Sequence, residues 1–317
     1  MTAMSANKND GGPIDISVAV PCLNEEANAQ PIAAAIGDAL TRVGVTYEII
    51  FIDNGSTDQT VPLIKDLCAA DHRVKLIVNN RNYGQMRSPT YAIYQATGRA
   101  VIGMCADFQD PPEMLGQFVE RWRSGVQIVL GVRESERSSL VTRVIRALGY
   151  GFLHRFADYA VIPGATGFGL YDRKVVDALS QWREPEPFFR GMLVESGFRL
   201  ETIAYRRPER AGGRSKNNFA TILSFGLSAL ASSSKELLRL PFYVAVVAGI
   251  LSILTLIGAA VSFLVGRGGS ALLLATLIQA NFAIVFGFLG LIGEQVRLVS
   301  ERVRNTPLVI EKERVNF

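Results

Sequence analysis

The sequence contains few of the residues on which redox sites and histidine-based sites depend. Among its 317 residues there are three cysteines and two histidines. The cysteines form no CxxC pair and no even set, which indicates a reducing compartment and excludes a disulfide framework. A histidine-based zinc site or a Ser-His-Asp triad is hard to build from two histidines, although one of them could still serve a triad.

Glycine-rich phosphate-binding motifs are also missing. No GxGxxG follows the first apolar run and GxxxxGK[ST] occurs nowhere, which disfavours a dinucleotide oxidoreductase and a P-loop nucleotidase. The net charge of +4 and the isoelectric point near 9.0 would suit a nucleic-acid partner. However, no run of lysine and arginine exceeds two residues, and the basic residues gather beside the apolar end of the chain. We therefore expect a lipid bilayer as partner and no nucleic acid.

Charge is almost absent from one region near the C-terminus. From Pro241 to Gly293 the only charged residue is Arg267. Residues 241–265 and 271–293 are each long enough, at about 1.5 Å per helical residue, to cross a hydrocarbon core about 30 Å thick. The glycine-rich turn 266–270 joins them. The pattern predicts two transmembrane helices that form a hairpin.

Basic residues beside the hairpin predict its orientation. Arg267 alone lies in the turn, whereas eight basic residues flank the outer ends: Lys216, Lys235, Arg239, Arg297, Arg302, Arg304, Lys312 and Arg314. The positive-inside rule therefore predicts a multi-pass protein of the inner (cytoplasmic) membrane whose large domain is cytoplasmic. We expect a disordered N-terminus (1–13), a globular domain (14–216), membrane-surface amphipathic helices (217–240), the hairpin (241–293) and a cytoplasmic tail (294–317).

Short apolar runs alternate with longer amphipathic segments in the first 200 residues. We expect strands at 16–20, 48–52, 74–78, 100–104 and 127–131, with helices at 25–42, 60–70, 87–97 and 111–124. This alternation predicts an α/β fold with a mostly parallel sheet flanked by helices on both faces. Such sheets bind ligands at the carboxyl ends of their strands, where residues 21–26, 53–58, 79–84, 107–110 and 133 follow.

Carboxylates follow several of these strands. Asp58 has a structural explanation as the cap of the next helix, and Asp110 starts an Asp-Pro-Pro-Glu helix beginning with capping-box spacing. The sequence offers no such explanation for Asp53 or Asp107. Two aspartates at the ends of parallel strands indicate that both face one crevice.

Several short motifs occur in order along the chain. They are PCLNEE (21–26), IDNGSTD (52–58), ADFQDPPE (106–113), GLYDRK (169–174), FRG (189–191) and YRRPERAGGRSK (205–216). Together with two C-terminal spans, this order resembles family 2 glycosyltransferases. Within that family it is most similar to the dolichyl-phosphate mannose synthase-like and bacterial polyprenyl-phosphate glycosyltransferases. The resemblance extends from about Ile14 to Val299.

The resemblance implies a GT-A type sheet that binds a nucleotide sugar with a divalent metal ion, Mg²⁺ or Mn²⁺. It assigns the nucleotide sugar to Pro21, Asn24, Glu25, Asp53, Asp107 and Gln109, and the metal to Asp107 and Gln109. The lipid phosphate is expected at Arg133, Arg207, Arg210, Ser215 and Lys216, and catalysis at Asp107, Arg207 and Lys216. The implied reaction is the inverting transfer of one sugar, with a UDP-sugar expected, to polyprenyl (undecaprenyl) phosphate at the cytoplasmic face. A homo-oligomer serving lipopolysaccharide or other surface-glycan biosynthesis is expected.

The chain departs from the family pattern in three motifs. Asn54 replaces the second aspartate of a DD pair, Cys105 replaces the first of a DxD motif, and residues 167–169 read Gly-Phe-Gly instead of Asp-Phe-Arg. The retained Asp107 favours an active enzyme, whereas the missing carboxylates leave open a non-catalytic, lipid- or nucleotide-binding scaffold of a polysaccharide assembly. A processive polysaccharide synthase is rejected, because residues 117–122 are one residue too long for QxxRW.

Overall fold

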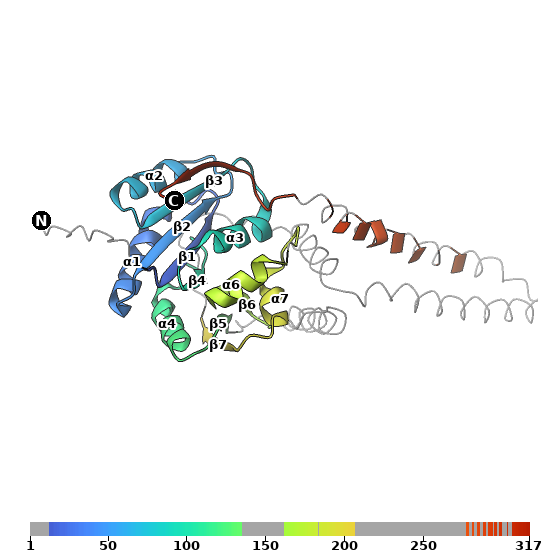
Figure 1. Cartoon of the computed structure of the whole chain (residues 1–317). Coiled ribbons are helices and arrows are strands. Elements are labelled where there is room, and N and C mark those ends of the chain that lie inside the picture. The colour runs from blue at the N-terminus through green and yellow to red at the C-terminus, as the bar shows by residue number, and fades with distance from the viewer. Residues whose placement is uncertain are drawn as a thin grey trace, which may run out of the picture.

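The computed structural model describes residues 13–134, 162–182, 184–206 and 306–317, together with separate positions between 277 and 303. An eight-stranded sheet with the order β7-β5-β6-β4-β1-β2-β3-β8 organises these residues (Figure 1). The strands are β1 (Ile16–Cys22), β2 (Tyr47–Asp53), β3 (Val74–Asn79), β4 (Ala100–Gly103), β5 (Ile128–Arg133), β6 (Ala165–Asp172), β7 (Leu200–Tyr205) and β8 (Glu311–Val315). The helices are α1 (Ala29–Val43), α2 (Thr60–Ala70), α3 (Gly84–Gln95), η1 (Pro112–Met114), α4 (Leu115–Arg123), α6 (Arg173–Ser180) and α7 (Phe189–Glu195).

The sheet is mostly parallel, as the sequence predicts. β1 pairs in parallel with β2 and β4, β2 with β3, and β5 with β7. β6 runs antiparallel to both β4 and β5, and β8 runs antiparallel to β3. Every residue of β2 is buried, because this strand has helices over both of its faces. The GT-A type α/β fold is therefore confirmed.

Helices cover both faces of the sheet (Figure 1). On one face Ile32 of α1, Ile64 of α2 and Phe118 of α4 belong to one buried apolar cluster. On the other face α3, α6 and α7 contribute to a second cluster, which contains Ile93 and Val175. The two clusters hold the strands in place from both faces of the sheet, so the loops at the carboxyl ends of the strands begin at fixed positions.

The sequence predicts five of these strands and all four helical segments between residues 25 and 124. The predicted helix 60–70 coincides with α2, but α1 begins at Ala29 instead of residue 25. Residues 25–28 form a turn there, in which the backbone N–H of Asn28 donates to the carbonyl of Glu25. The strands β6, β7 and β8 are missing from the prediction. In β8 the sequence Glu-Lys-Glu-Arg-Val carries no apolar alternation, because this edge strand is held by its backbone pairing with β3.

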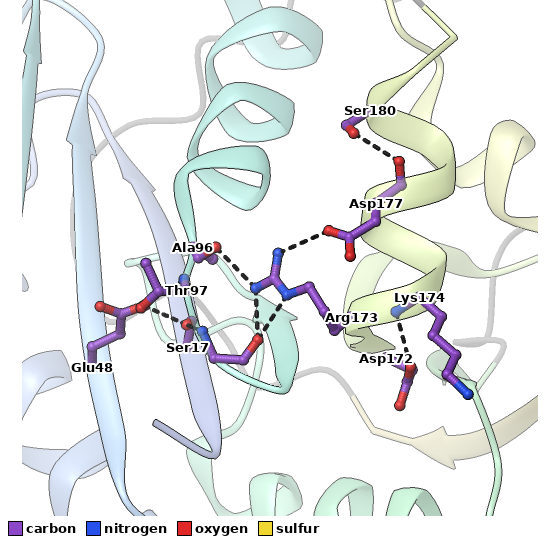
Figure 2. A network of polar contacts seen from close by, with 10 residues as sticks. Ser17, Glu48, Ala96, Thr97, Asp172, Arg173, Lys174, Asp177 and Ser180 are labelled. Carbon is purple, nitrogen blue, oxygen red and sulfur yellow. Dashed lines mark hydrogen bonds and ion pairs between the residues drawn. The ribbon is translucent and has the colours of Figure 1, made fainter. Parts of the chain in front are cut away.

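A polar network closes the sheet at the amino ends of β1 and β2, opposite the loops that carry the sequence motifs. Figure 2 shows the Arg173 guanidinium donating to the carbonyl of Ala96. The same guanidinium also donates to the carbonyl of Gly98. The backbone N–H of Gly98 donates to Ser17 Oγ at 2.7 Å. A Cβ at position 98 would lie 2.7 Å from that oxygen, so only glycine fits this position. The network anchors the start of α6 to the centre of the sheet.

Glu48 is the buried charge in this network. Its side chain accepts hydrogen bonds from Ser17 Oγ and Thr97 Oγ1 and pairs with Lys75 Nζ at 2.6 Å. Burial raises the pKa of Glu48, but the Lys75 ammonium and the hydrogen bonds lower it by more, so its pKa is below the usual range. Glu48 therefore stabilises the fold in its ionised form.

The predicted membrane segments fall largely outside the described residues. This applies to the surface helices 217–240 and the first span 241–265, while only separate, helical positions of the second span 271–293 are described. Within the described part of the chain, no helix has both the length and the apolar character needed to cross a membrane. The predicted tail 294–317 ends in β8, which pairs with β3 of the globular domain.

Candidate active site

The sequence motifs meet at the carboxyl ends of β1, β2 and β4, which are neighbours in the sheet. Cys22 lies opposite Asp53 in the parallel β1–β2 register, and the backbone N–H of Asn54 donates to the carbonyl of Cys22. β4 lies on the other side of β1 and leads into the loop that contains Asp107. Three adjacent strand ends therefore supply the predicted donor residues, which are Pro21, Asn24, Glu25, Asp53, Asp107 and Gln109.

The loops after β1 and β2 are joined by reciprocal hydrogen bonds. The backbone N–H of Asn24 donates to Ser56 Oγ at 2.8 Å, and Asn24 Oδ1 accepts from the backbone N–H of Thr57 at 2.8 Å. The backbone N–H of Glu25 donates to Thr60 Oγ1 at 2.8 Å. Asn24 holds a φ of 57°, a strained conformation that asparagine tolerates better than most residues. The two loops form one rigid rim.

Asp53 stabilises the part of this rim that follows β2. Its side chain is 1% exposed and accepts hydrogen bonds from the backbone N–H groups of Gly55 and Ser56, at 3.0 Å and 3.1 Å. The sequence interpretation that Asp53 lacks a structural role is wrong, because its carboxylate holds the turn that follows β2. Its predicted contact with the nucleotide stays a prediction.

Carboxylates dominate the electrostatics beneath the rim. Burial raises the pKa of the Cys22 thiol well above its usual value, and Asp53, Glu25 and Asp58 raise it further. The thiol is therefore neutral at physiological pH and unsuited to act as a nucleophile. The predicted donor residue Glu25 is 9% exposed and accepts from Asn28 Nδ2 at 2.6 Å. These carboxylates are held by hydrogen bonds from neighbouring backbone and side-chain groups.

Asn54 connects β2 to the loop after β3. Its Nδ2 donates to Asn82 Oδ1 at 2.9 Å and to the carbonyl of Gly84 at 3.2 Å. Its Oδ1 accepts from the backbone N–H of Tyr83 at 2.8 Å and from Asn79 Nδ2 at 3.3 Å. Both ends of the amide are in use. The departure from the family's DD pair therefore serves a structural purpose in this chain.

The loop after β4 presents Asp107. The Asp107 side chain is partly exposed, in contrast to that of Asp53, and its Oδ1 accepts from the backbone N–H of Gln109 at 3.2 Å. Phe108, between them, has a φ of 59° and packs against the buried core. Asp107 and Gln109 are therefore both partly exposed on this loop.

The buried side chain of Asp110 stabilises the loop after β4 through hydrogen bonds. It is 2% exposed and accepts from the backbone N–H of Cys105 at 2.9 Å and from the Tyr205 hydroxyl at 3.2 Å. Burial raises the pKa of Asp110, against the lowering effects of the Cys105 hydrogen bond and the Arg133 charge. The capping-box interpretation of Asp110 is wrong, because its carboxylate turns back to Cys105 and across to β7. The sequence carries no signal for this contact with Tyr205.

Arg133 lies at the end of β5 beside the same network. Its Nε donates to the Tyr205 hydroxyl at 3.4 Å, and its side chain is partly exposed. The structure thus brings this predicted lipid-phosphate residue next to the Asp107 loop. The other predicted acceptor residues, Arg207, Arg210, Ser215 and Lys216, lie outside the described residues.

A divalent metal ion fits the oxygen atoms of the Asp107 loop. Among the described residues, no group of three or more histidine, cysteine, aspartate or glutamate side chains could hold a metal by itself. Asp107 and Gln109 both offer oxygen ligands, which Mg²⁺ and Mn²⁺ prefer. Mg²⁺ commonly takes one or two protein ligands and completes its shell with phosphate oxygens and water. The site therefore fits a metal that binds together with a diphosphate.

Comparison with known proteins defines the class. Residues 17–179 match the glycosyl transferase family 2 domain, and the chain belongs to this family. It is 31% identical over 94% of its length to an uncharacterized glycosyltransferase of Synechocystis, and covers 94% of that protein. The chain is therefore a glycosyltransferase.

Other relatives are named for their lipid acceptors. The prophage-derived bactoprenol glucosyl transferase of Shigella flexneri is 28% identical, with 94% of this chain and 97% of that protein covered. The undecaprenyl-phosphate 4-deoxy-4-formamido-L-arabinose transferase of Pseudomonas paraeruginosa is 30% identical, with 93% and 89% covered. These relatives confirm the resemblance to the polyprenyl-phosphate branch.

A solved structure agrees with the fold. Glucosyl-3-phosphoglycerate synthase from Mycobacterium tuberculosis superimposes with a TM-score of 0.51 at 17% identity, covering 69% of this chain and 78% of that chain. At this identity the likeness concerns the fold alone.

Proposed function

We propose that the chain transfers one sugar, with inversion, from a nucleotide sugar to polyprenyl phosphate at the cytoplasmic face of the membrane. The observation that carries this proposal is the accessible Asp107 loop beside the rim formed by residues 24–26 and 53–60. Two relatives named for bactoprenol and undecaprenyl phosphate, similar along nearly the whole chain, support the acceptor. Surface-glycan biosynthesis is the pathway we propose.

The donor binds across the rim in this proposal. The loops that contain Pro21, Asn24 and Glu25 would face the nucleoside, with the turn held by Asp53 beneath it. A UDP-sugar is the proposed donor. Because the hydrogen bonds of the rim already fix its loops, little conformational entropy is lost when the nucleotide binds.

Asp107 and Gln109 would hold Mg²⁺ or Mn²⁺ at the diphosphate. When bound, the metal supplies positive charge that neutralises the leaving nucleoside diphosphate. The role of the chain is to orient these two side chains, which it does through the Asp107–Gln109 turn and the anchor at Asp110.

The acceptor phosphate needs a positive environment and positioning, not a general base. Its second pKa is near 6, so it is mostly dianionic at neutral pH and can attack the anomeric carbon directly. Arg133, with Arg207, Arg210, Ser215 and Lys216, would bind it, since guanidinium groups match phosphate oxygens. Direct displacement inverts the configuration, so an α-linked donor gives a β-linked product. The absence of a carboxylate at Gly167 is compatible with this reaction.

We further propose that the hairpin 241–293 holds a homo-oligomeric protein in the cytoplasmic membrane. Its uncharged spans and flanking basic residues support this placement. Large apolar side chains are exposed at described helical positions, which suits contact with lipid: Ile278, Ile284, Val285, Leu289, Ile292, Val296, Val299 and Val303. Reporter fusions at Gly268 and after Phe317 should report opposite sides of the membrane, and matching sides would contradict the hairpin.

A transfer assay tests the proposed reaction. The full-length protein, purified in detergent with Mg²⁺ or Mn²⁺, is given a panel of nucleotide sugars and either undecaprenyl phosphate or undecaprenol. We expect a lipid-linked sugar from one donor with undecaprenyl phosphate and none with the phosphate-free lipid. Equal transfer to both lipids would contradict the acceptor. Nucleotide binding without transfer from any donor would favour the non-catalytic scaffold.

A further inference from the structure

The last residues of the chain contact the globular domain next to the proposed donor site. β8 pairs with β3 in an antiparallel register in which Glu311 lies opposite Asn79 and Glu313 opposite Val78. β3 belongs to the domain that begins near residue 13, whereas β8 follows β7 by about one hundred residues of chain. The strand at this edge of the sheet is therefore supplied by the C-terminal tail (Figure 1).

Arg87 of α3 binds the tail just before β8. Its Nε donates to the carbonyl of Leu308 at 2.8 Å, and its Nη2 donates to the carbonyl of Pro307 at 2.8 Å. The same guanidinium lies 5.3 Å from the centre of the Tyr83 ring. Two backbone carbonyls of the tail are thus satisfied by a side chain from the first turn of α3.

The loop between β3 and α3 also binds the tail. The backbone N–H of Asn80 donates to the carbonyl of Ile310 at 3.0 Å. Asn80 Oδ1 in turn accepts from the Tyr83 hydroxyl at 2.7 Å. Residues 80–87 are therefore held from the tail side by contacts at Asn80 and Arg87.

On its other side this loop supports the donor turn. The backbone N–H of Tyr83 and the side chain of Asn82 are both bound by the buried amide of Asn54. Gly55 packs against the backbone of the same loop, since a Cβ at position 55 would lie 3.1 Å from the backbone nitrogen of Asn82. Gly55 also donates its N–H to Asp53. The contacts run without a gap from the tail to the turn that follows β2.

We propose that the C-terminal tail 306–317 positions the nucleotide-binding turn through residues 80–87, so that donor binding depends on the tail being docked on β3. This inference rests on the proposed function for the location of the donor. The tail follows the predicted membrane hairpin in the chain, so docking would tie the donor site to the membrane segment. Arg87 and Asn80 are positioning residues in this account.

Two tail contacts distinguish this path from general stabilisation. Arg87→Ala removes both bonds to the tail carbonyls on the donor side. Lys65→Ala removes the ion pair with Glu313, which is 2.6 Å long but joins the tail to α2, away from residues 80–87. Lys65→Ala is therefore the matched control, and deletion of residues 306–317 is the strongest perturbation.

The experiment measures two quantities in the full-length protein and its variants. Amide hydrogen exchange is followed in peptides covering residues 53–56 and 80–84, and UDP affinity is measured by calorimetry with Mn²⁺. Arg87→Ala and the deletion should speed exchange in both peptides and weaken UDP binding by about fivefold or more, the equivalent of one net hydrogen bond. Lys65→Ala should change neither quantity by more than about twofold.

Each outcome has one meaning. Unchanged exchange at 53–56 in folded Arg87→Ala would overturn the coupling, as would faster exchange with wild-type UDP affinity. Equal weakening by Lys65→Ala would show general destabilisation and also overturn it. If the deletion does not fold, Arg87→Ala, with Arg87→Lys as a partial rescue, decides. The wild-type chain could also bind neither UDP nor any other nucleotide, while Arg87→Ala still speeds exchange at residues 53–56. In that case the proposed donor site is wrong, and the dependence of nucleotide binding on the tail is wrong with it.

Discussion

Restoring the family's aspartate at position 54 should damage this protein. In Asn54→Asp the acceptor side is kept, but a carboxylate oxygen replaces the Nδ2 that donates to Asn82 Oδ1 and the carbonyl of Gly84. Oxygen then faces two oxygens in a site that is 8% exposed, beside the carboxylate of Asp53. Two lost hydrogen bonds at about 1 kcal/mol each, with the cost of a buried charge added, give a destabilisation of about 2–4 kcal/mol.

Thermal unfolding of the full-length protein in detergent measures this effect. For a domain of this size the expected loss corresponds to a decrease in Tm of about 5–10 °C. Asn80→Asp is the matched control, because Asn80 is exposed and its Oδ1 acts as an acceptor for the Tyr83 hydroxyl in either form. Burial raises the pKa of the new carboxyl group, so the deficit should shrink as the pH falls and the group protonates. An unchanged Tm, or a turnover increased tenfold by the restored carboxylate, would refute this account of Asn54.

Three further changes test the fold, the general base and the acceptor. Glu48→Gln leaves Lys75 without its buried partner and should lower the free energy of unfolding at pH 7 by about 3 kcal/mol, measured by chemical denaturation. The control Asp177→Asn, in a more exposed pair with Arg173, should lower it by less than about 1 kcal/mol. Equal losses would contradict the burial argument. Gly167→Asp should not increase turnover, because no base is needed and a φ of 92° disfavours any side chain; a tenfold gain would contradict this. Lys216→Ala should raise the KM for polyprenyl phosphate far more than that for the nucleotide sugar, whereas equal effects would indicate collapse of the loop.

Hydrophobic pattern was sufficient to predict five strands of the sheet but not the interior strand β6 or the edge strands β7 and β8. The strands around residues 16–20 and 48–52 are apolar except for Ser17 and Glu48, and buried parallel strands are typically rich in such apolar residues. β6 contains Gly167 and Gly169 and lacks that signal. A Cβ at position 169 would lie 2.4 Å from the carbonyl of Val129, so close strand packing selects glycine there. β8 is held by pairing across a long sequence separation, which local pattern does not reveal.

The sequence predicted where the site lies, but it did not predict the role of each residue in the site. Strand-end logic correctly brought Asn24, Asp53 and Asp107 to adjacent strand ends. It did not distinguish the buried, turn-forming Asp53 from the accessible Asp107, because exposure depends on tertiary packing. The Asp-Pro-Pro-Glu motif also predicted that Asp110 caps a helix, whereas its carboxylate accepts a hydrogen bond from Tyr205, which lies 95 residues away in the sequence.

The rate of sugar transfer by Asp107→Asn tests the central claim most directly. The amide keeps the shape of the side chain and its hydrogen bond from Gln109 but loses the charge that a divalent metal requires. With undecaprenyl phosphate and the active nucleotide sugar, we expect turnover to fall at least about 100-fold, or roughly 2.7 kcal/mol of barrier. Asp66→Asn on the exposed side of α2 should match the wild type. Turnover of Asp107→Asn within about threefold of the wild type, less than about 1 kcal/mol, would contradict the account.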